Sequence, residues 1–328
     1  MPEEIRTVAI VGCGVIGMSW ATLCLSRGLK VIVSDPAKGA KEALERYLDQ
    51  ARPFLEAQGN FEELATNYEF VSDIVPRLAE ADFVQEVPLS CTDNGPERQD
   101  FKRELMKTLD EWARPGVVIA SSSSGLPSSA FIQQCEQDQS RILIGHPFNP
   151  PHLIPLVEVV PHAGTSEEYI SIAMRFYQSL GRRPIRVRHE VPGFVSNRLQ
   201  AAINNEAYSL ISRGVVSAED LDFAVTQGPG LRWALTGPIA TNALGGGGGP
   251  DGFVRRIERL GPSIRAWEDD MLKHRFDWSD ERLSSLQDSV EEWLGATDWT
   301  NLVEDRDSIL VQLLAAKSNT TSMRTHSP

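Results

Sequence analysis

The residues with the clearest chemistry are a histidine and a glutamate in the segment GHPFNPPHLIPLVEVVPH (145–162). His146 follows an apolar stretch, and Glu158 lies twelve residues later within the apolar run LVEVV. An unpaired carboxylate buried in a strand would cost several kcal/mol, so we expect a partner for Glu158. A carboxylate orients a histidine ring and stabilises its charged form. The pair therefore predicts a general base, His146, held by Glu158; a structural histidine is the alternative.

Polar side chains gather at two further points of the chain. The segment ASSSSGLPSS (120–129) follows the apolar run VVIA, which places Ser124 after a strand, where ligands of open α/β sheets bind. These serines also suit the N-terminal cap of a helix. Asn197 lies in PGFVSNRLQ (192–200). It can donate to a substrate oxygen or occupy a polar helix face, because asparagine is poor in helix interiors without a hydrogen-bonding role.

A candidate anchor for an acidic substrate lies in TQGPGLRWALTGP (226–238). Arg232 stands there among glycines and apolar residues, and a guanidinium can pair with a carboxylate through parallel hydrogen bonds. Stacking of Arg232 on Trp233 is the other interpretation. The 4 cysteines show neither Cys-x-x-Cys pairing nor metal-ligand spacing. We therefore expect reduced thiols and no metal site.

The N-terminal region contains every part of a dinucleotide-binding turn. The apolar run IRTVAIV precedes a Gly-x-Gly-x-x-Gly turn, a helical stretch and the run VIVSD. The glycines permit the turn, the approach of a pyrophosphate to a helix N-terminus, and close packing of helix on strand. The acid that ends the second strand would accept hydrogen bonds from the ribose 2′-hydroxyl, which predicts NAD rather than NADP. The residues expected to contact the cofactor are Gly12, Gly14, Val15, Ile16, Gly17 and Asp35.

Strand-like and helix-like segments alternate up to about residue 187. Strands are predicted over 5–11, 30–34, 69–71, 82–85, 117–120, 142–145, 155–160 and 184–187. Helices are predicted over 16–27, 38–57, 97–113 and 166–180, and after RVRHEVPG over 194–214, 218–228, 251–275, 280–294 and 304–316. This order predicts an α/β fold, a Rossmann-type doubly wound, mostly parallel sheet followed by an all-α C-terminal domain. We place the NAD-binding domain at 1–189 and the helical substrate domain at 190–328, with a disordered tail from about 317.

Two features of the helical part leave alternatives open. Of the 7 tryptophans, Trp267, Trp278, Trp293 and Trp299 lie near the C-terminus, which suits either a subunit interface or an ordinary core. The run Gly245–Gly249 cannot sustain a helix. We expect a flexible loop there, which would be a lid over the active site or a solvated connector.

Charge and length exclude several classes of function. The 328 residues can bury a large core, and the net charge of −13 disfavours nucleic acid and anionic membrane surfaces as partners. No apolar run approaches the roughly 20 residues that span a bilayer. The acidic start MPEEIR fits no signal or transit peptide. We therefore expect a cytoplasmic protein with a small-molecule substrate.

These motifs together resemble the 3-hydroxyacyl-CoA dehydrogenase superfamily over about residues 5–315. The matching segments, in family order, are GCGVIGMSWA, SSSSGL, GHPFNPPHLIPLVEVVPH, GFVSNRLQ and GLRWALTGP. Within the superfamily the chain is most similar to the λ-crystallin branch of L-gulonate 3-dehydrogenases. The resemblance implies NAD-dependent oxidation of an alcohol β to a carboxyl or thioester, and a homodimer formed through the helical domain. The alternative to an enzyme is a protein without turnover, either with a structural, crystallin-like role or one that only binds NAD.

The resemblance also implies roles for single residues. His146 would remove the hydroxyl proton while hydride passes to the nicotinamide, and Glu158 would orient His146. Ser124 and Asn197 would hold the substrate oxygen. The residues implied to contact NAD from the segment PERQDFK are Glu97 and Lys102.

The substrate stays open between three kinds. Family members that act on acyl-CoA hold its phosphates with basic residues after the second strand. Between residues 47 and 99 this chain has no lysine, and its arginines there are Arg52, Arg77 and Arg98. This favours a small 3-hydroxy acid, first L-gulonate, which would become 3-dehydro-L-gulonate. A 3-hydroxyacyl-CoA is one alternative, and carnitine is another, whose quaternary ammonium an aromatic cage including Trp233 and Tyr208 would bind.

Overall fold

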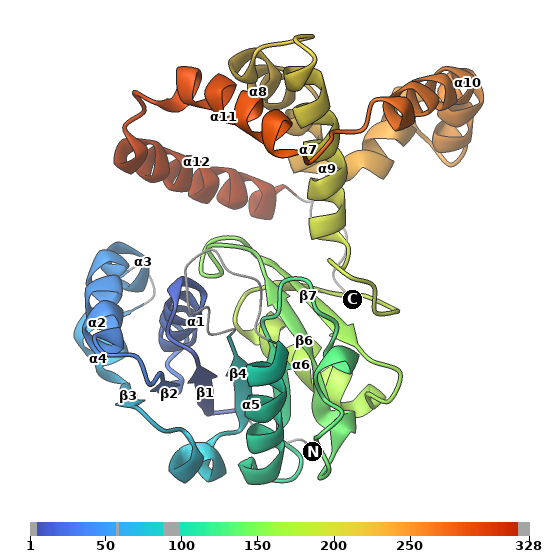
Figure 1. Cartoon of the computed structure of the whole chain (residues 1–328). Coiled ribbons are helices and arrows are strands. Elements are labelled where there is room, and N and C mark those ends of the chain that lie inside the picture. Colours follow the sequence, from blue (N-terminus) through green and yellow to red (C-terminus); the bar gives the residue numbers. More distant parts are fainter. Residues whose placement is uncertain (1–4, 57–58, 88–98, 321–328) are drawn as a thin grey trace. The chain divides into compact units, whose positions relative to one another are not determined.

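The chain forms two compact units, Met1–Arg198 and Leu199–Pro328, in a computed structural model that describes residues 5–56, 59–87 and 99–320 (Figure 1). The first unit contains a sheet flanked by helices, and the second consists of helices (Figure 1). Each unit is described by itself below. Within the described ranges, none of the helices combines the length and apolar character that crossing a bilayer requires.

The sheet of the first unit has eight strands in the order β3-β2-β1-β4-β5-β6-β7-β8. Neighbouring strands run parallel except β6 and β7, which are antiparallel. The predicted mostly parallel, doubly wound sheet is therefore confirmed. The strands are β1 Thr7–Val11, β2 Lys30–Ser34, β3 Tyr68–Val71, β4 Phe83–Glu86, β5 Val118–Ser121, β6 Ile142–Pro147, β7 Leu156–Pro161 and β8 Arg183–Arg186.

The helices of the first unit differ from the prediction after the second strand. Instead of one helix over 38–57, the chain forms two, because Pro53 lacks an N–H and is tolerated only in the first turn of a helix. A short helix after Asn60 was not predicted; the Asn60 side chain caps it by accepting from the Glu62 amide at 3.1 Å. The helices are α1 Val15–Leu25, α2 Ala40–Gln50, α3 Arg52–Glu56, α4 Phe61–Thr66, α5 Gln99–Trp112 and α6 Glu167–Ser179, with 3₁₀ turns at Val75–Glu80, Ser128–Ala130 and Gln139–Arg141.

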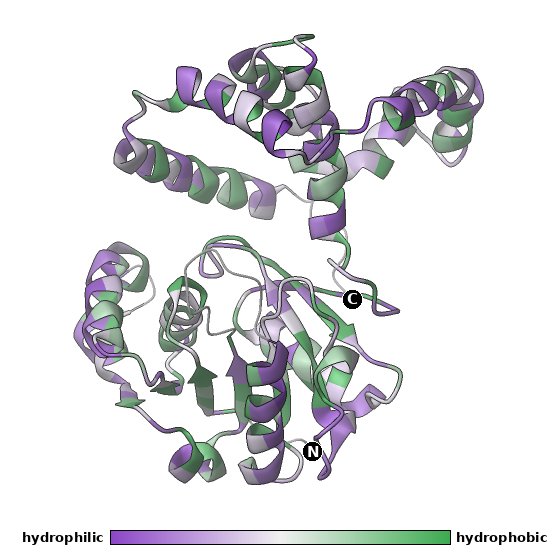
Figure 2. Cartoon of the chain, viewed as in Figure 1, coloured by the Kyte–Doolittle hydropathy of each residue, from purple (hydrophilic) through white to green (hydrophobic). Residues whose placement is uncertain are grey.

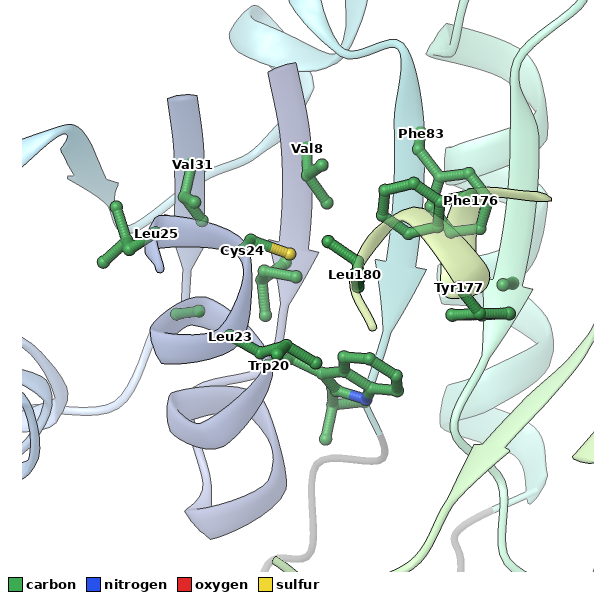
Figure 3. Close-up of a cluster of buried hydrophobic side chains, with 14 of the residues drawn as sticks. Val8, Trp20, Leu23, Cys24, Leu25, Val31, Phe83, Phe176, Tyr177 and Leu180 are labelled. Atoms are coloured by element: carbon green, nitrogen blue, oxygen red, sulfur yellow. The ribbon is translucent and has the colours of Figure 1, made fainter. Parts of the chain in front are cut away.

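Both faces of the sheet bury apolar side chains. On one face the strands pack against α1 and α6, and the stacked rings of Phe83 and Phe176 have centroids 4.0 Å apart (Figure 3). On the other face Val84 and Ile119 pack with Met106 of α5. Burial on two faces explains why central strands such as β1 and β2 are nearly continuous apolar runs rather than alternating ones.

The second unit contains a helix that the sequence did not predict. The helices are α7 Ser196–Ser212, which begins in the first unit, α8 Ala218–Gln227, α9 Pro229–Gly245, α10 Gly252–Lys273, α11 Asp280–Leu294 and α12 Trp299–Asn319. The missed helix is α9, whose glycines and prolines hide its pattern and kink it at Gly237, where φ is +68°. Helix α12 continues past the expected start of a disordered tail near 317, and residues 321–328 lie outside the described ranges.

The run Gly245–Gly249 comprises the last residue of α9 and a turn, and its flexibility stays a prediction. Helix α9 ends at Gly245, and the turn that follows leads into α10. The guanidinium of Arg255 donates to the carbonyls of Gly246 at 2.9 Å and Gly248 at 2.7 Å. The Arg259 guanidinium also donates to the carbonyl of Gly245 at 3.2 Å, one of the carbonyls that a helix C-terminus otherwise leaves without a partner.

Candidate active site

His146 and Glu158 lie opposite each other on neighbouring strands. Strands β6 and β7 are antiparallel, and their register pairs His146 with Glu158. The histidine Nδ1 is 2.8 Å from the Glu158 Oε2, and both side chains are buried. An ionised carboxylate only accepts hydrogen bonds, so in the neutral imidazole Nδ1 is the protonated nitrogen and Nε2 keeps the lone pair. The geometry therefore leaves His146 able to accept a proton at Nε2.

The second oxygen of Glu158 is held by the start of α7. Oε1 accepts from the backbone N–H of Val195 at 3.1 Å and of Ser196 at 3.0 Å. Burial raises the pKa of Glu158, but the hydrogen bonds from His146 and from the Ser196 and Val195 amides outweigh it, so the pKa of Glu158 is lowered. The carboxylate is therefore ionised at neutral pH and can stabilise a protonated His146.

Aromatic rings enclose the His146 imidazole. The ring centroid of Phe148 lies 5.3 Å from that of His146, and that of Phe194 lies 5.6 Å away. Phe194 is fully buried and adopts a left-handed backbone with φ of +51°, a conformation that is rare for a bulky residue. The burial of the pair beside these rings lowers the local dielectric constant and strengthens the electrostatic interaction between His146 and Glu158.

A hydrogen bond connects Asn197 to Ser124, and its acceptor is the backbone carbonyl of Ser124. Asn197 is the second residue of α7, and its Nδ2 donates to the backbone carbonyl of Ser124. Nearby, the N–H of Gly193 donates to the carbonyl of Gly125 at 3.1 Å. Because the adjacent Ser196 binds Glu158, the start of α7 connects the serine segment to the His146–Glu158 pair.

The three glycines of the first turn differ in the space around them. A Cβ on Gly12, whose φ is +106°, would lie 2.4 Å from the Val87 carbonyl oxygen. A Cβ on Gly17 would lie 1.9 Å from the carbonyl oxygen of Gly12, so α1 packs directly on the turn. A Cβ on Gly14 would meet no atom within 4 Å among the described residues. The open side of Gly14, at the N-terminus of α1, is where a pyrophosphate fits.

Asp35 directly follows β2 and holds the glycine turn. Its Oδ2 accepts from the backbone N–H of Cys13 at 2.7 Å, and its Oδ1 accepts from that of Ala37 at 2.8 Å. Each carboxylate oxygen can accept a second hydrogen bond. Asp35 can therefore hold the turn and a ribose hydroxyl at once.

A buried ion pair at the end of β4 was missed by sequence reasoning. The Lys102 ammonium lies 3.1 and 3.0 Å from the two carboxylate oxygens of Glu86, and both residues are buried. The Ser121 hydroxyl also donates to Glu86. An acid directly after an apolar strand, as at Asp35, was the available signal. Lys102 as a cofactor contact stays a prediction, and Glu97 lies outside the described residues.

Arg232 is exposed on α9, in the second unit, and its substrate role stays a prediction. The predicted cage residue Tyr208 lies edge-on to Phe276 and Trp278, with centroid distances of 5.5 and 6.1 Å. Within the described part of the chain, no cluster of three or more His, Cys, Asp or Glu side chains is arranged to hold a metal ion.

Comparison with known proteins identifies both parts of the chain. Residues 7–191 match the profile of the 3-hydroxyacyl-CoA dehydrogenase NAD binding domain, and residues 193–276 match that of the C-terminal domain. A Gibberella moniliformis protein named 3-hydroxyacyl-CoA dehydrogenase is 71% identical over 100% of this chain and 99% of its own. An L-carnitine dehydrogenase of Streptomyces coelicolor is 40% identical, with 96% of each chain covered.

Among solved structures, one similar chain is a 5-formyl-3-hydroxy-2-methylpyridine 4-carboxylic acid 5-dehydrogenase, described as an NAD⁺-dependent dismutase. It is 27% identical with a TM-score of 0.70, and the match covers 94% of this chain and 97% of that one. The similarity therefore extends over both the sheet and the helical part.

Proposed function

The chain belongs to the 3-hydroxyacyl-CoA dehydrogenase family, and on this premise we propose that it oxidises the 3-hydroxyl of a small hydroxy acid. It is an NAD-dependent dehydrogenase that acts on CH–OH groups. The observation that carries the proposed mechanism is the buried His146–Glu158 pair, with 2.8 Å between Nδ1 and Oε2.

In this mechanism the Nε2 of His146 accepts the proton of the substrate hydroxyl. NAD bound at the glycine turn would supply the acceptor for the hydride of the carbon that bears this hydroxyl. Glu158 stabilises the imidazolium that forms, and the α7 amides on its Oε1 keep it in place. Ser124 and Asn197 hold the substrate oxygen in this mechanism. The hydrogen bond from Asn197 Nδ2 to the Ser124 carbonyl keeps the two residues next to each other for this role.

The glycine turn supports the proposed position of the cofactor. The open side of Gly14 admits the pyrophosphate, and Asp35 is placed to accept from the adenosine ribose. The first turn of α1 carries no acidic residue that would repel an anion. The proposed contacts are Gly12, Gly14, Val15, Ile16, Gly17, Asp35, Glu97 and Lys102.

The pairing of charged side chains between residues 47 and 99 supports a small acid rather than an acyl-CoA as substrate. Arg52 lies 3.7 Å from a carboxylate oxygen of each of Asp49, Glu56 and Glu62. Arg77 is paired with both Glu69 and Glu80. Carboxylates thus balance Arg52 and Arg77, the two described arginines between residues 47 and 99, which leaves little positive potential there for the phosphates of CoA. Arg98 lies outside the described residues.

Two small acids are the leading candidates. L-carnitine is favoured because the Streptomyces coelicolor relative, which is similar over 96% of the chain, is named an L-carnitine dehydrogenase. L-gulonate is the candidate that the sequence motifs favoured. Both carry a carboxylate, for which Arg232 is the proposed anchor.

Substrate choice is tested by initial rates of NADH formation with L-carnitine, L-gulonate and 3-hydroxybutyryl-CoA at alkaline pH. We expect kcat/KM for one of the small acids to exceed that for the CoA ester at least ~10-fold. The phosphates of CoA would find no basic partners, and a site discriminates strongly against a substrate whose binding leaves charged groups unpaired. A preference for the CoA ester would overturn the proposed substrate class. NADH binding without turnover of any of the three would favour a binding or structural role instead.

The second unit supports a homodimer. Its helices leave large apolar side chains exposed, among them Leu231 and Ile239 on α9 and Leu302 and Ile309 on α12. Apolar and polar residues lie interspersed along α12 (Figure 2). Large exposed apolar surface marks an interaction site. We therefore assign these faces to contact with a second copy of the chain.

A further inference from the structure

Gln85 lies on β4 with 1% of its surface exposed, in a face of the sheet that is otherwise apolar. We propose that Gln85 is a positioning residue that fixes the backbone directly before His146 relative to the serine segment. The proposal rests on the proposed function, because it assumes that His146 is the base. A buried amide is retained only at a cost unless all its hydrogen bonds are made.

Every polar atom of the Gln85 side chain has a buried partner. Its Oε1 accepts from the Tyr177 hydroxyl at 2.7 Å. Its Nε2 donates to the Ser122 hydroxyl oxygen at 2.8 Å and lies 3.4 Å from the Gly145 carbonyl. The amide cannot be reversed, because a carbonyl oxygen such as that of Gly145 cannot donate.

Trp20 joins this network to α1. Its Nε1 donates to the same Ser122 oxygen at 3.1 Å. The rings of Trp20 and Tyr177 lie together in the apolar cluster, with centroids 5.6 Å apart (Figure 3). The network therefore links the cofactor helix α1, the serine segment after β5, strand β6 and helix α6.

Gly145 is held from two sides. Its carbonyl faces the Gln85 amide, and a Cβ on Gly145 would lie 1.9 Å from the Tyr177 hydroxyl oxygen. That hydroxyl therefore packs directly against the Gly145 α-carbon. Gly145 precedes His146 in β6, so a shift of Gly145 is passed to the His146 ring. A misplacement of about 1 Å at a reacting group can cost ~10²-fold in rate.

The test compares Gln85→Met with Gln85→Glu, using whichever of L-carnitine, L-gulonate and 3-hydroxybutyryl-CoA the enzyme turns over. Methionine keeps the length of the side chain but removes every hydrogen bond. We expect kcat to fall at least ~10-fold, while the NADH dissociation constant from fluorescence titration changes less than about threefold. With substrate deuterated at the reacting carbon, the isotope effect on kcat should rise, because the chemical step becomes slower than product release.

The carboxyl introduced by Gln85→Glu gives a readout that a purely structural role would not move. It can accept from the Tyr177 hydroxyl in either state, and the Ser122 hydroxyl can reorient to donate to it when it is ionised. The Gly145 carbonyl can only accept, so the carboxyl can bond to it only when protonated. The ratio of the kcat of Gln85→Glu to that of the unmodified enzyme should therefore fall with rising pH. We expect a fall of roughly tenfold over the pH range in which the introduced carboxyl ionises. A ratio that is constant with pH would overturn the proposal.

Ser26→Ala is the matched control, since it removes one buried hydrogen bond, from Ser26 Oγ to the Leu23 carbonyl at 2.7 Å, at the far end of α1. A folded Gln85→Met variant with the kcat of Ser26→Ala would contradict the inference. If Gln85→Met does not fold, Tyr177→Phe replaces it, and an unchanged kcat there has the same meaning. Turnover retained in His146→Gln would instead refute the base itself, whatever Gln85 does.

Discussion

The first and second units bury their apolar residues to very different extents. In the first unit the strand residues Val8, Ile10 and Ile144 are fully buried. In the second unit, helices α9 and α12 contain no buried residue among those described. The first unit therefore has a core of its own, whereas the helical unit presents apolar faces that another surface must cover.

The difference in burial corresponds to two proposed roles, catalysis in the first unit and association in the second. The proposed base and its carboxylate lie on paired strands, where register leaves little freedom of position. The proposed carboxylate anchor, Arg232, lies on an exposed helix of the second unit. Changes in the first unit should therefore affect chemistry and cofactor binding, and changes on the exposed helices should affect association.

The largest expected effect is that of His146→Gln. We expect kcat to fall at least ~10²-fold, because glutamine cannot accept the substrate proton, while NADH affinity changes little. Steady-state rates and fluorescence titration measure the two quantities. The control is His274→Gln, an exposed histidine of the second unit, which should keep its kcat. If His146→Gln keeps full turnover, His146 has no part in proton transfer.

A smaller effect is expected from charge on the exposed face of α12. Leu302 and Ile309 are 49% and 64% exposed and lie on one face of the helix. The double substitution Leu302→Asp with Ile309→Asp should weaken self-association at least ~10-fold, measured as molar mass by light scattering. Trp112→Asp makes the same kind of change on α5 of the first unit, where Trp112 is 53% exposed, and should leave the mass unaltered. A monomeric starting protein would refute the proposed dimer.

The smallest effect concerns cofactor choice. Asp35→Ala removes the proposed acceptor for the ribose 2′-hydroxyl and the partner of the Cys13 amide. We expect KM for NAD to rise about tenfold and the discrimination against NADP to relax, because a carboxylate repels the 2′-phosphate. Asp49→Ala, an exposed acid of α2, is the control. Parallel kinetics with NAD and NADP test this, and an unchanged preference would remove the ribose assignment from Asp35.

Local pattern was enough for most of the fold. Most of the eight strands were predicted because they are apolar runs bounded by turn residues, whereas β8, with the sequence RPIR, is an exposed edge strand. Prediction failed where glycine and proline masked a helix, as in α9. The glycine run that follows has no periodicity of its own, and its hydrogen bonds from Arg255 come from the next helix.

The sequence by itself determined the order of the elements, the glycine turn with Asp35, and the cofactor class, since each depends on residues close together in the chain. Only the tertiary structure decided which groups meet. The antiparallel register of β6 and β7 pairs His146 with Glu158, and the start of α7 holds that carboxylate. The contacts of Gln85 reach residues 37, 60 and 92 positions away. No local pattern encodes such contacts, because they form only when separate strands and helices pack on the same sheet.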